Sequence, residues 1–307
     1  MADTAHTHIL STENLYASYG STTVLHGVSL AVRSGEVLCL SGPNGSGKST
    51  LLSLMAGIVP DSLRIDSAGR QPSFDGVQLS ECSRKQNALH IAYMIQDEQS
   101  AWNYTARDVV LTGRYAHTVS GLYSQCDRDV TDSVITAMGL EAIAERRIFS
   151  LSGGEAQKIR IARALAQEPD MLLLDEPVAN LDFSYQAELL TLVAQLAHTK
   201  NLGVLVSIHD LNTAARFADR LALLPRNGAC ITGTVEDVLT AENLSAAYDA
   251  RFGVFRHPVY GCPQVYTTSA GPVQNDGVTD TVEGYVRLPP EDHVSPPEDV
   301  LTELPRL

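Results

Sequence analysis

The chain has 307 residues, 44% of them hydrophobic, which is enough apolar material for one large or two modest domains. Its net charge of −14 disfavours a surface that coats nucleic acid. The longest apolar runs, such as residues 171–174 and 204–208, are far shorter than the roughly 20 residues that a membrane-spanning helix needs. Because the first eight residues are polar and no apolar stretch of a signal peptide follows them, we expect the protein to stay in the cytoplasm.

The five cysteines stand at wide, irregular spacings, and no two of them form a C-x-x-C pair. Their odd number and their spacing argue against both a disulfide framework and a zinc site. We therefore expect reduced thiols in a reducing compartment.

The first pattern along the chain is residues 22–32, where partly alternating apolar residues and β-formers predict early antiparallel strands. Residues 37–40 form a short apolar run after a Ser34-Gly35 turn, and residues 51–56 look helical. Residues 42–50 are therefore expected to lie between a strand and a helix.

Residues 42–50, the P-loop, match the phosphate-binding pattern G-x-x-x-x-G-K-[ST] at every fixed position. Glycines let consecutive backbone N–H groups point at phosphate oxygens, and the helix that follows adds its positive end. Lys48 is predicted to meet the β- and γ-phosphates of a nucleoside triphosphate, and the Ser49 hydroxyl to ligate Mg²⁺. The predicted nucleotide-binding residues of this loop are Gly42, Pro43, Asn44, Gly45, Ser46, Gly47, Lys48, Ser49 and Thr50.

A second glycine-containing segment lies about 100 residues further on. Ser152 can cap a helix that Glu155 opens, while Gly153 and Gly154 allow close approach of the backbone. The start of such a helix is another anion site, although one P-loop already serves the phosphates of one nucleotide. By itself, the segment could also be an ordinary capped helix.

Residues 171–174 and 204–208 are continuous apolar runs, typical of strands that are buried on both faces. Residues 185–200 between them have the apolar spacing of a helix, and strands that alternate with helices predict an α/β fold with a parallel sheet.

Polar residues directly follow both of these strands. Asp175 and Glu176 end the first and His209 the second, so their side chains should emerge where open α/β sheets bind ligands. We interpret Asp175 as the acidic partner of Mg²⁺ and Glu176 as the general base that activates the attacking water.

Together these residues resemble the ATP-binding subunit of ABC transporters over roughly residues 8–262. The resemblance implies an α/β, RecA-like P-loop NTPase core with a mostly parallel sheet, an N-terminal antiparallel β subdomain and an α-helical subdomain at about residues 97–160. It leaves residues 263–307 as an acidic, proline-rich tail that we expect to be weakly structured. A partner-binding arm is the alternative interpretation of the tail.

The resemblance also implies roles for single residues. Tyr19 matches the aromatic residue that stacks on adenine, Gln96 the glutamine that senses Mg²⁺ and the attacking water, and His209 the switch histidine. Glu176, His209 and Gln96 are thus the predicted catalytic residues, with Ser49, Gln96 and Asp175 at the metal. The remaining matches are the signature residues Ser152, Gly153, Gly154 and Glu155, and the D-loop residue Asp182. The D-loop departs from the usual pattern in its early positions, but its Leu-Asp ending is intact.

The resemblance implies that two copies pack head to tail, so that the signature residues of one copy cap the γ-phosphate held by the P-loop of the other. We predict a homodimer that binds ATP and Mg²⁺, does not bind nucleic acid, and lies on the cytoplasmic face of the inner membrane as a peripheral subunit. Its helical subdomain would dock on membrane permease subunits. A substrate-binding protein would deliver the cargo to these subunits.

Residues 113–117 and 252–258 resemble stretches in importers of iron-siderophore complexes, haem and vitamin B12, which indicates cargo only by kinship. The alternatives are a zinc or manganese importer, and a soluble ABC ATPase of iron–sulfur assembly or of nucleic acid or ribosomes.

Overall fold

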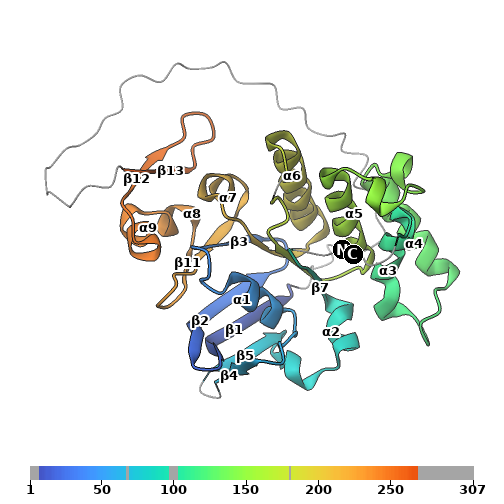
Figure 1. Ribbon diagram of the computed structural model, residues 1–307, viewed down its shortest axis with the longest axis horizontal. Coiled ribbons are helices and arrows are strands. Elements are labelled where there is room, and N and C mark those ends of the chain that lie inside the picture. The colour runs from blue at the N-terminus through green and yellow to red at the C-terminus, as the bar shows by residue number, and fades with distance from the viewer. Residues whose placement is uncertain (1–6, 67–68, 97–102, 180, 269–307) are drawn as a thin grey trace, which may run out of the picture.

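The computed structural model describes residues 7–66, 69–96, 103–179 and 181–268. Within these ranges the chain forms one antiparallel sheet, one mostly parallel sheet, a group of helices beside it and a C-terminal hairpin (Figure 1). No helix of this part of the chain is long and apolar enough to cross a membrane.

The N-terminal sheet has the order β2-β1-β5-β6, and β4 also pairs with β1. All its pairings are antiparallel, as residues 22–32 predict. In β2 (Thr22–Arg33) the buried residues recur with a spacing of two or three, because one face of the sheet packs on the core. The other strands are β1 (Ile9–Tyr19), β4 (Leu63–Ile65), β5 (Arg70–Phe74) and β6 (Val77–Gln78).

The central sheet has the order β11-β10-β3-β9-β8-β7, with parallel pairing everywhere except between β10 and β11. Every residue of β3, β8 and β9 is buried, which explains their continuous apolar runs. The six strands are β3 (Val37–Ser41), β7 (Ile91–Met94), β8 (Met171–Asp175), β9 (Gly203–Ser207), β10 (Arg220–Leu223) and β11 (Ile231–Gly233).

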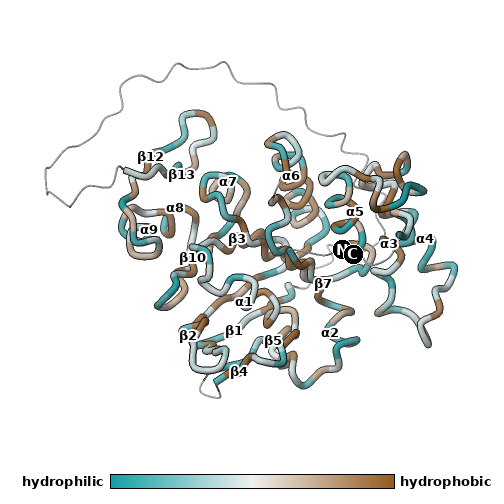
Figure 2. Tube along the Cα trace, in the orientation of Figure 1, coloured by the Kyte–Doolittle hydropathy of each residue, from teal (hydrophilic) through white to brown (hydrophobic). Residues whose placement is uncertain are grey.

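The central sheet separates two hydrophobic cores. Along β3, Val37 and Cys39 belong to one core, whereas Leu38 and Leu40 belong to the other, because successive side chains of a strand point to opposite faces. Helix α1 (Lys48–Met55) and the antiparallel sheet cover one face; α5 (Gly153–Ala166), α6 (Phe183–Lys200) and α7 (Leu211–Phe217) cover the other (Figure 1). Figure 2 shows hydrophobic stretches of the tube gathered at the central strands.

The helices between β7 and β8 begin at well-formed caps. Thr105, Ser124 and Ser152 each accept a hydrogen bond from the third helical residue and form capping boxes. These caps start α3 (Ala106–Thr112), α4 (Gln125–Ala137) and α5, which begin within the region at about residues 97–160 that is expected to be helical. Four short 3-10 turns also occur in the described chain, namely η1 (Leu79–Glu81), η2 (Gly113–His117), η3 (Glu141–Ile143) and η4 (Ile148–Ser150). Helix α2 (Arg84–His90) directly precedes β7.

The C-terminal part contains α8 (Val235–Val238), α9 (Ala241–Tyr248) and a hairpin of β12 (Phe252–Arg256) and β13 (Pro263–Thr267). Arg256 pairs with Pro263 across this hairpin, so the folded chain continues five residues past residue 262, where the sequence places the end of the domain. Residues 269–307 of the predicted tail lie outside the described residues.

Candidate active site

The P-loop connects β3 to α1 and is closely packed. Gly42 has φ 156°, and a Cβ atom on it would lie 2.2 Å from the carbonyl oxygen of Leu224, so only glycine fits this position. Gly47 caps α1 with φ 96° and no side-chain hydrogen bond, which leaves the first N–H groups of the helix unbonded to a capping side chain. The loop therefore points backbone donors at the carboxyl end of the central sheet.

Lys48 is buried at the base of this loop. Its Nζ atom donates hydrogen bonds to the carbonyl oxygens of Gly42, at 2.9 Å, and of Pro43, at 3.2 Å. Burial lowers the pKa of Lys48, and the carboxylates of Glu176 and Asp175 partly oppose that effect. The carbonyl oxygens and carboxylates thus hold the ammonium group of Lys48 within the P-loop.

Asp175 and Glu176 emerge at the carboxyl end of β8, and the neighbouring strand holds both of them. Ser207, the last residue of β9, is fully buried; its Oγ donates to Asp175 Oδ1 at 2.7 Å and accepts from the backbone N–H of Glu176 at 2.8 Å. The sequence reasoning missed Ser207. Its signal is a lone polar residue that ends an otherwise apolar, fully buried strand.

Glu176 lies between Gln96 and His209. Gln96 Nε2 donates to Glu176 Oε2 at 2.5 Å, and His209 Nε2 lies 2.6 Å from Glu176 Oε1. These residues follow β7, β8 and β9, so three adjacent parallel strands deliver them to one point. Glu176 also has φ 48°, a conformation that non-glycine residues seldom adopt and that recurs at functional sites.

The signature residues occupy the start of α5. Ser152 Oγ accepts from the Glu155 N–H at 3.3 Å, and Glu155 Oε2 accepts from the Ser152 N–H at 2.7 Å. These bonds, together with Arg146, hold the pKa of Glu155 below its ordinary value. Among the described residues, the side-chain hydrogen bonds of this segment stay within the cap and with Arg146, and none joins the P-loop of the same chain.

The last two predicted residues also lie apart from the Glu176 cluster. Tyr19 ends β1, pairs with Leu63 and is partly buried against the core. Asp182 is the exposed N-cap residue of α6 but makes no side-chain capping bond. Residue 180 of the predicted D-loop lies outside the described residues.

Comparisons with known proteins identify the family of the chain. The family model described as ABC transporter matches residues 25–179. An uncharacterised ABC transporter ATP-binding protein of Methanocaldococcus jannaschii is 36% identical over 79% of this chain and 82% of its own length. A hemin import ATP-binding protein of Gloeobacter violaceus is 37% identical over 83% of this chain and 92% of its own. A cobalamin import ATP-binding protein of Halobacterium salinarum is 36% identical over 83% of this chain and 63% of its own.

Two solved structures are similar in fold as well. A chain of a metal-chelate type ABC transporter in an inward-facing conformation has a TM-score of 0.72 and 28% identity, covering 85% of this chain and 98% of that one. An ATP-binding cassette of an ABC transporter in its ADP conformation has a TM-score of 0.66 and 25% identity, covering 79% and 98%. The chain therefore belongs to the ATP-binding, ATP-hydrolysing proteins of the ABC transporter family.

Proposed function

We propose that this chain is the ATPase subunit of a membrane importer for an iron-siderophore complex, haem or cobalamin. The observation that carries the catalytic part is the contact of Glu176 with Gln96 and His209 at the carboxyl ends of three parallel strands. The cargo rests on the relatives that are named for hemin and cobalamin import, and on the similarity to a metal-chelate type transporter. A zinc or manganese importer is the second candidate, because residues 113–117 and 252–258 also resemble stretches in such importers.

The residues present fit ATP with Mg²⁺. Ser46 Oγ is buried in the P-loop without a hydrogen-bond partner among the described residues, as expected of a donor that serves a phosphate. Ser49, Asp175 and Gln96 offer hydroxyl, carboxylate and amide oxygens, which are the hard ligands that Mg²⁺ prefers. When bound, the ion would neutralise charge on the phosphates.

The roles of the side chains follow from their contacts. Glu176 would take the proton from the water that attacks the γ-phosphate, because its carboxylate is held in place by Gln96 and His209 and its backbone by Ser207. Lys48 would place its positive charge on the β- and γ-phosphates. Tyr19 would stack on the adenine ring.

We further propose that the site is completed by a second copy. The signature residues stand at the N-terminal end of a 14-residue helix, where backbone N–H groups favour an anion, and their side-chain hydrogen bonds among the described residues do not involve the P-loop of their own chain. In a head-to-tail dimer they would cap the γ-phosphate of the partner copy, and Asp182 would contact the partner across the same interface. Closing this dimer around ATP, and opening it after hydrolysis, would drive the permease.

The domain boundaries support the same function. Residues 8–262, extended by β13, would form the ATPase domain, with the helical subdomain at about residues 97–160 docked on permease subunits. The protein would then lie on the cytoplasmic face of the membrane as a peripheral subunit, and a substrate-binding protein would deliver the cargo to its complex.

The proposal is tested by purifying the chain from its native source and measuring ATP hydrolysis and its co-purifying proteins. We expect ATPase activity that depends on Mg²⁺. We also expect the chain to co-purify with a polytopic membrane protein whose gene lies beside its own. Association with soluble partners only would contradict transport, and the pocket of the adjacent binding protein would decide between a metal chelate and a free metal ion.

A further inference from the structure

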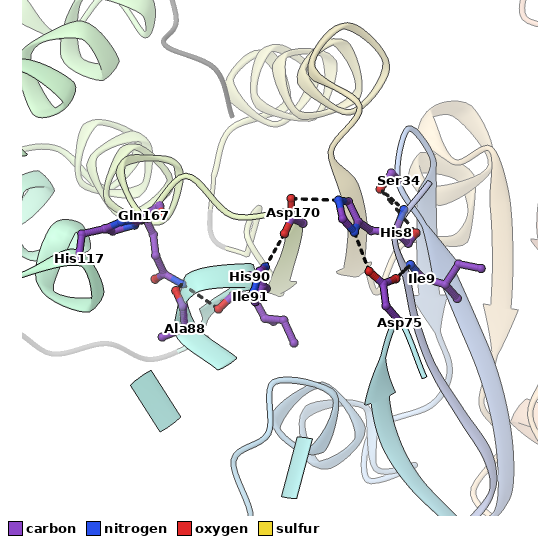
Figure 3. Close-up of polar contacts among 10 residues, drawn as sticks. All are labelled: His8, Ile9, Ser34, Asp75, Ala88, His90, Ile91, His117, Gln167 and Asp170. Atoms are coloured by element: carbon purple, nitrogen blue, oxygen red, sulfur yellow. Dashed lines mark hydrogen bonds and ion pairs between the residues drawn. The ribbon is translucent and has the colours of Figure 1, made fainter. Parts of the chain in front are cut away.

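One residue joins three elements at the edge of the central sheet where the parallel strands begin, opposite the predicted nucleotide site. Gln167 is the C-cap residue of α5 and lies between η2 and the corner where α2 turns into β7 (Figure 3). The three elements are separate segments of the chain, and side-chain contacts hold them together.

Gln167 uses both its backbone and its side chain. His117 Nε2 lies 2.8 Å from the Gln167 carbonyl oxygen and must donate to it, since a carbonyl only accepts. Gln167 Nε2 donates to the carbonyl oxygens of Ala88, at 2.7 Å, and of Ile91, at 2.8 Å. The two N–H groups of one amide are thus both engaged at the α2–β7 corner.

These two carbonyl groups need a donor from outside their own elements. Ala88 lies in the last turn of α2, where carbonyl groups have no partner within the helix. Ile91 begins β7, which is the edge strand and pairs only with β8 among the described strands. Because α2 ends at His90 and β7 begins at Ile91, no loop residue is available to supply the donor.

Neighbouring contacts make the joint rigid. His90 Nδ1 lies 2.7 Å from Asp170 Oδ2, and the Asp170 N–H donates to the His90 carbonyl at 2.9 Å (Figure 3). On the other side, Gly113 of η2 packs so tightly that a Cβ atom would lie 2.1 Å from the Arg163 carbonyl oxygen of α5. The end of α5 therefore cannot shift without moving both η2 and the start of β7.

The far ends of the joined elements carry the residues of the active site. From Ile91, the chain follows β7 and two residues beyond its end to Gln96, which contacts Glu176; an extended chain of this length spans about 17 Å. From Gln167, α5 runs back about 21 Å to the signature residues. Gln167 thus fixes the start of β7 and the end of α5 relative to each other. These two elements lead to Gln96 and to the signature residues.

We propose that Gln167 is a positioning residue that sets Gln96 in a fixed place relative to the signature residues of the same chain. This inference rests on the proposed function, in which Gln96 serves the nucleotide of its own copy and the signature residues serve that of the partner. If the joint loosens, both groups cannot be aligned with the two nucleotides of the closed dimer at once. The P-loop, which binds ATP in each copy, is not part of the joint.

The test compares full-length variants by steady-state ATP hydrolysis, ATP binding and thermal unfolding. Gln167→Met keeps the side-chain length and removes the donors, whereas Gln167→Lys supplies a donor again. Lys85→Met is the matched control, because Lys85 Nζ donates to the Thr118 carbonyl at 2.7 Å and so ties α2 to the end of η2 without touching α5. His117→Phe removes the donor to Gln167 from the other side and provides the test if Gln167→Met does not fold.

We expect Gln167→Met to lower kcat by about 10-fold, as small misplacements of catalytic groups do, while KM and ATP affinity change less than about twofold. His117→Phe should lower kcat in the same way, and Gln167→Lys and Lys85→Met should keep at least about half of the wild-type kcat. A wild-type kcat in Gln167→Met, an equal loss in Gln167→Lys or Lys85→Met, or a loss confined to KM would overturn the inference. A wild-type chain without ATPase activity would overturn the proposed function, and the inference with it.

Discussion

Glu176 is bonded through both its side chain and its backbone, and this constrains what its substitution can do. Both carboxylate oxygens have a side-chain partner, and the backbone N–H is bonded to Ser207. A glutamine in its place keeps the shape but not the basicity of the carboxylate.

Glu176→Gln is expected to lower ATP hydrolysis by at least about 100-fold, because general-base catalysis contributes factors of this size. Since the P-loop is unchanged, the variant should bind ATP and accumulate as an ATP-bound dimer. Phosphate release and gel filtration with ATP and Mg²⁺ check the two parts. Hydrolysis at the wild-type rate would show that Glu176 is not the base.

Ser207→Ala removes the hydroxyl that bonds both Asp175 and Glu176. We expect the free energy of unfolding to fall by about 1–3 kcal/mol, because the buried Asp175 carboxylate and the partly buried Glu176 N–H lose their partner. ATP hydrolysis should fall further than stability explains, since the Asp175 carboxylate and the Glu176 backbone lose the group that orients them. Ser133→Ala on the surface of α4 is the control, and equal behaviour of the two variants in denaturation and ATPase assays would contradict the role of Ser207.

At the residue scale, the sequence predicts side chains that follow recognisable patterns. Asp175, Glu176 and His209 stand at or just after the ends of strands, as their apolar runs indicate. Lys48 begins the helix that follows the P-loop, as the motif predicts. Ser207 escapes prediction because its contact depends on the β8–β9 register, which pairs it with Asp175 and which no local pattern encodes.

Among the elements, η2 depends on a buried ion pair. Arg114 is 4% exposed; its Nε lies 3.2 Å from Asp127 Oδ1, and its Nη1 lies 2.6 Å from Glu168 Oε2. Burial alone would raise the pKa of Asp127, but hydrogen bonds from Ser124 and the pair with Arg114 hold that pKa below its ordinary value.

Arg114→Met is therefore expected to destabilise the protein by about 3–5 kcal/mol, because it leaves two carboxylates without their buried partner. Chemical denaturation measures the loss. Combining it with Asp127→Asn should recover part of the loss, and strictly additive losses would contradict the coupling.

The ion pair of Arg114 and Asp127 also predicts that the protein loses stability at acid pH. A carboxyl group whose pKa is lowered in the folded state stabilises the fold above its ordinary pKa, and this contribution is lost as the pH falls below about 4. The unfolding free energy of the wild type should decline there more steeply than that of Arg114→Met.

Elements with regular apolar patterns are predicted from the sequence, whereas elements without such patterns are not. The apolar runs of β3, β8 and β9 are confirmed as strands, and α3 to α6 lie in the regions predicted as helical. Strands β4 to β6 have no such run, and Pro72 interrupts the pattern of β5. Pairing of β4 and β5 with β1, and of β6 with β5, therefore defines these strands rather than local propensity.

For the whole molecule, the proposed dimer has a consequence that two inactive variants can show. In a mixture of Lys48→Ala and Ser152→Arg chains, a mixed dimer has one site with both an intact P-loop and intact signature residues. If chains pair at random, half of the dimers are mixed with one of two sites intact, so about a quarter of wild-type ATPase activity should return.

Mixing Lys48→Ala with Glu176→Gln is the control, because both defects belong to the same half of each site and no intact site can form. Recovery in the control, or none in the test mixture, would contradict the composite site. The sequence predicts this assembly only through the resemblance, since no pattern within one chain records which copy completes the site.

Because successive side chains of β3 point into opposite cores, the cysteine of this strand can report chemically on opening of the central sheet. Cys39 is wholly buried just before the P-loop, and burial raises the pKa of its thiol strongly, so the folded chain should protect it from alkylation. Cys126 is exposed and should react much faster than Cys39. The rate at which Cys39 is modified, followed by mass spectrometry, would then report how often the central sheet opens. ATP should lower this rate, because binding stabilises the folded chain against opening.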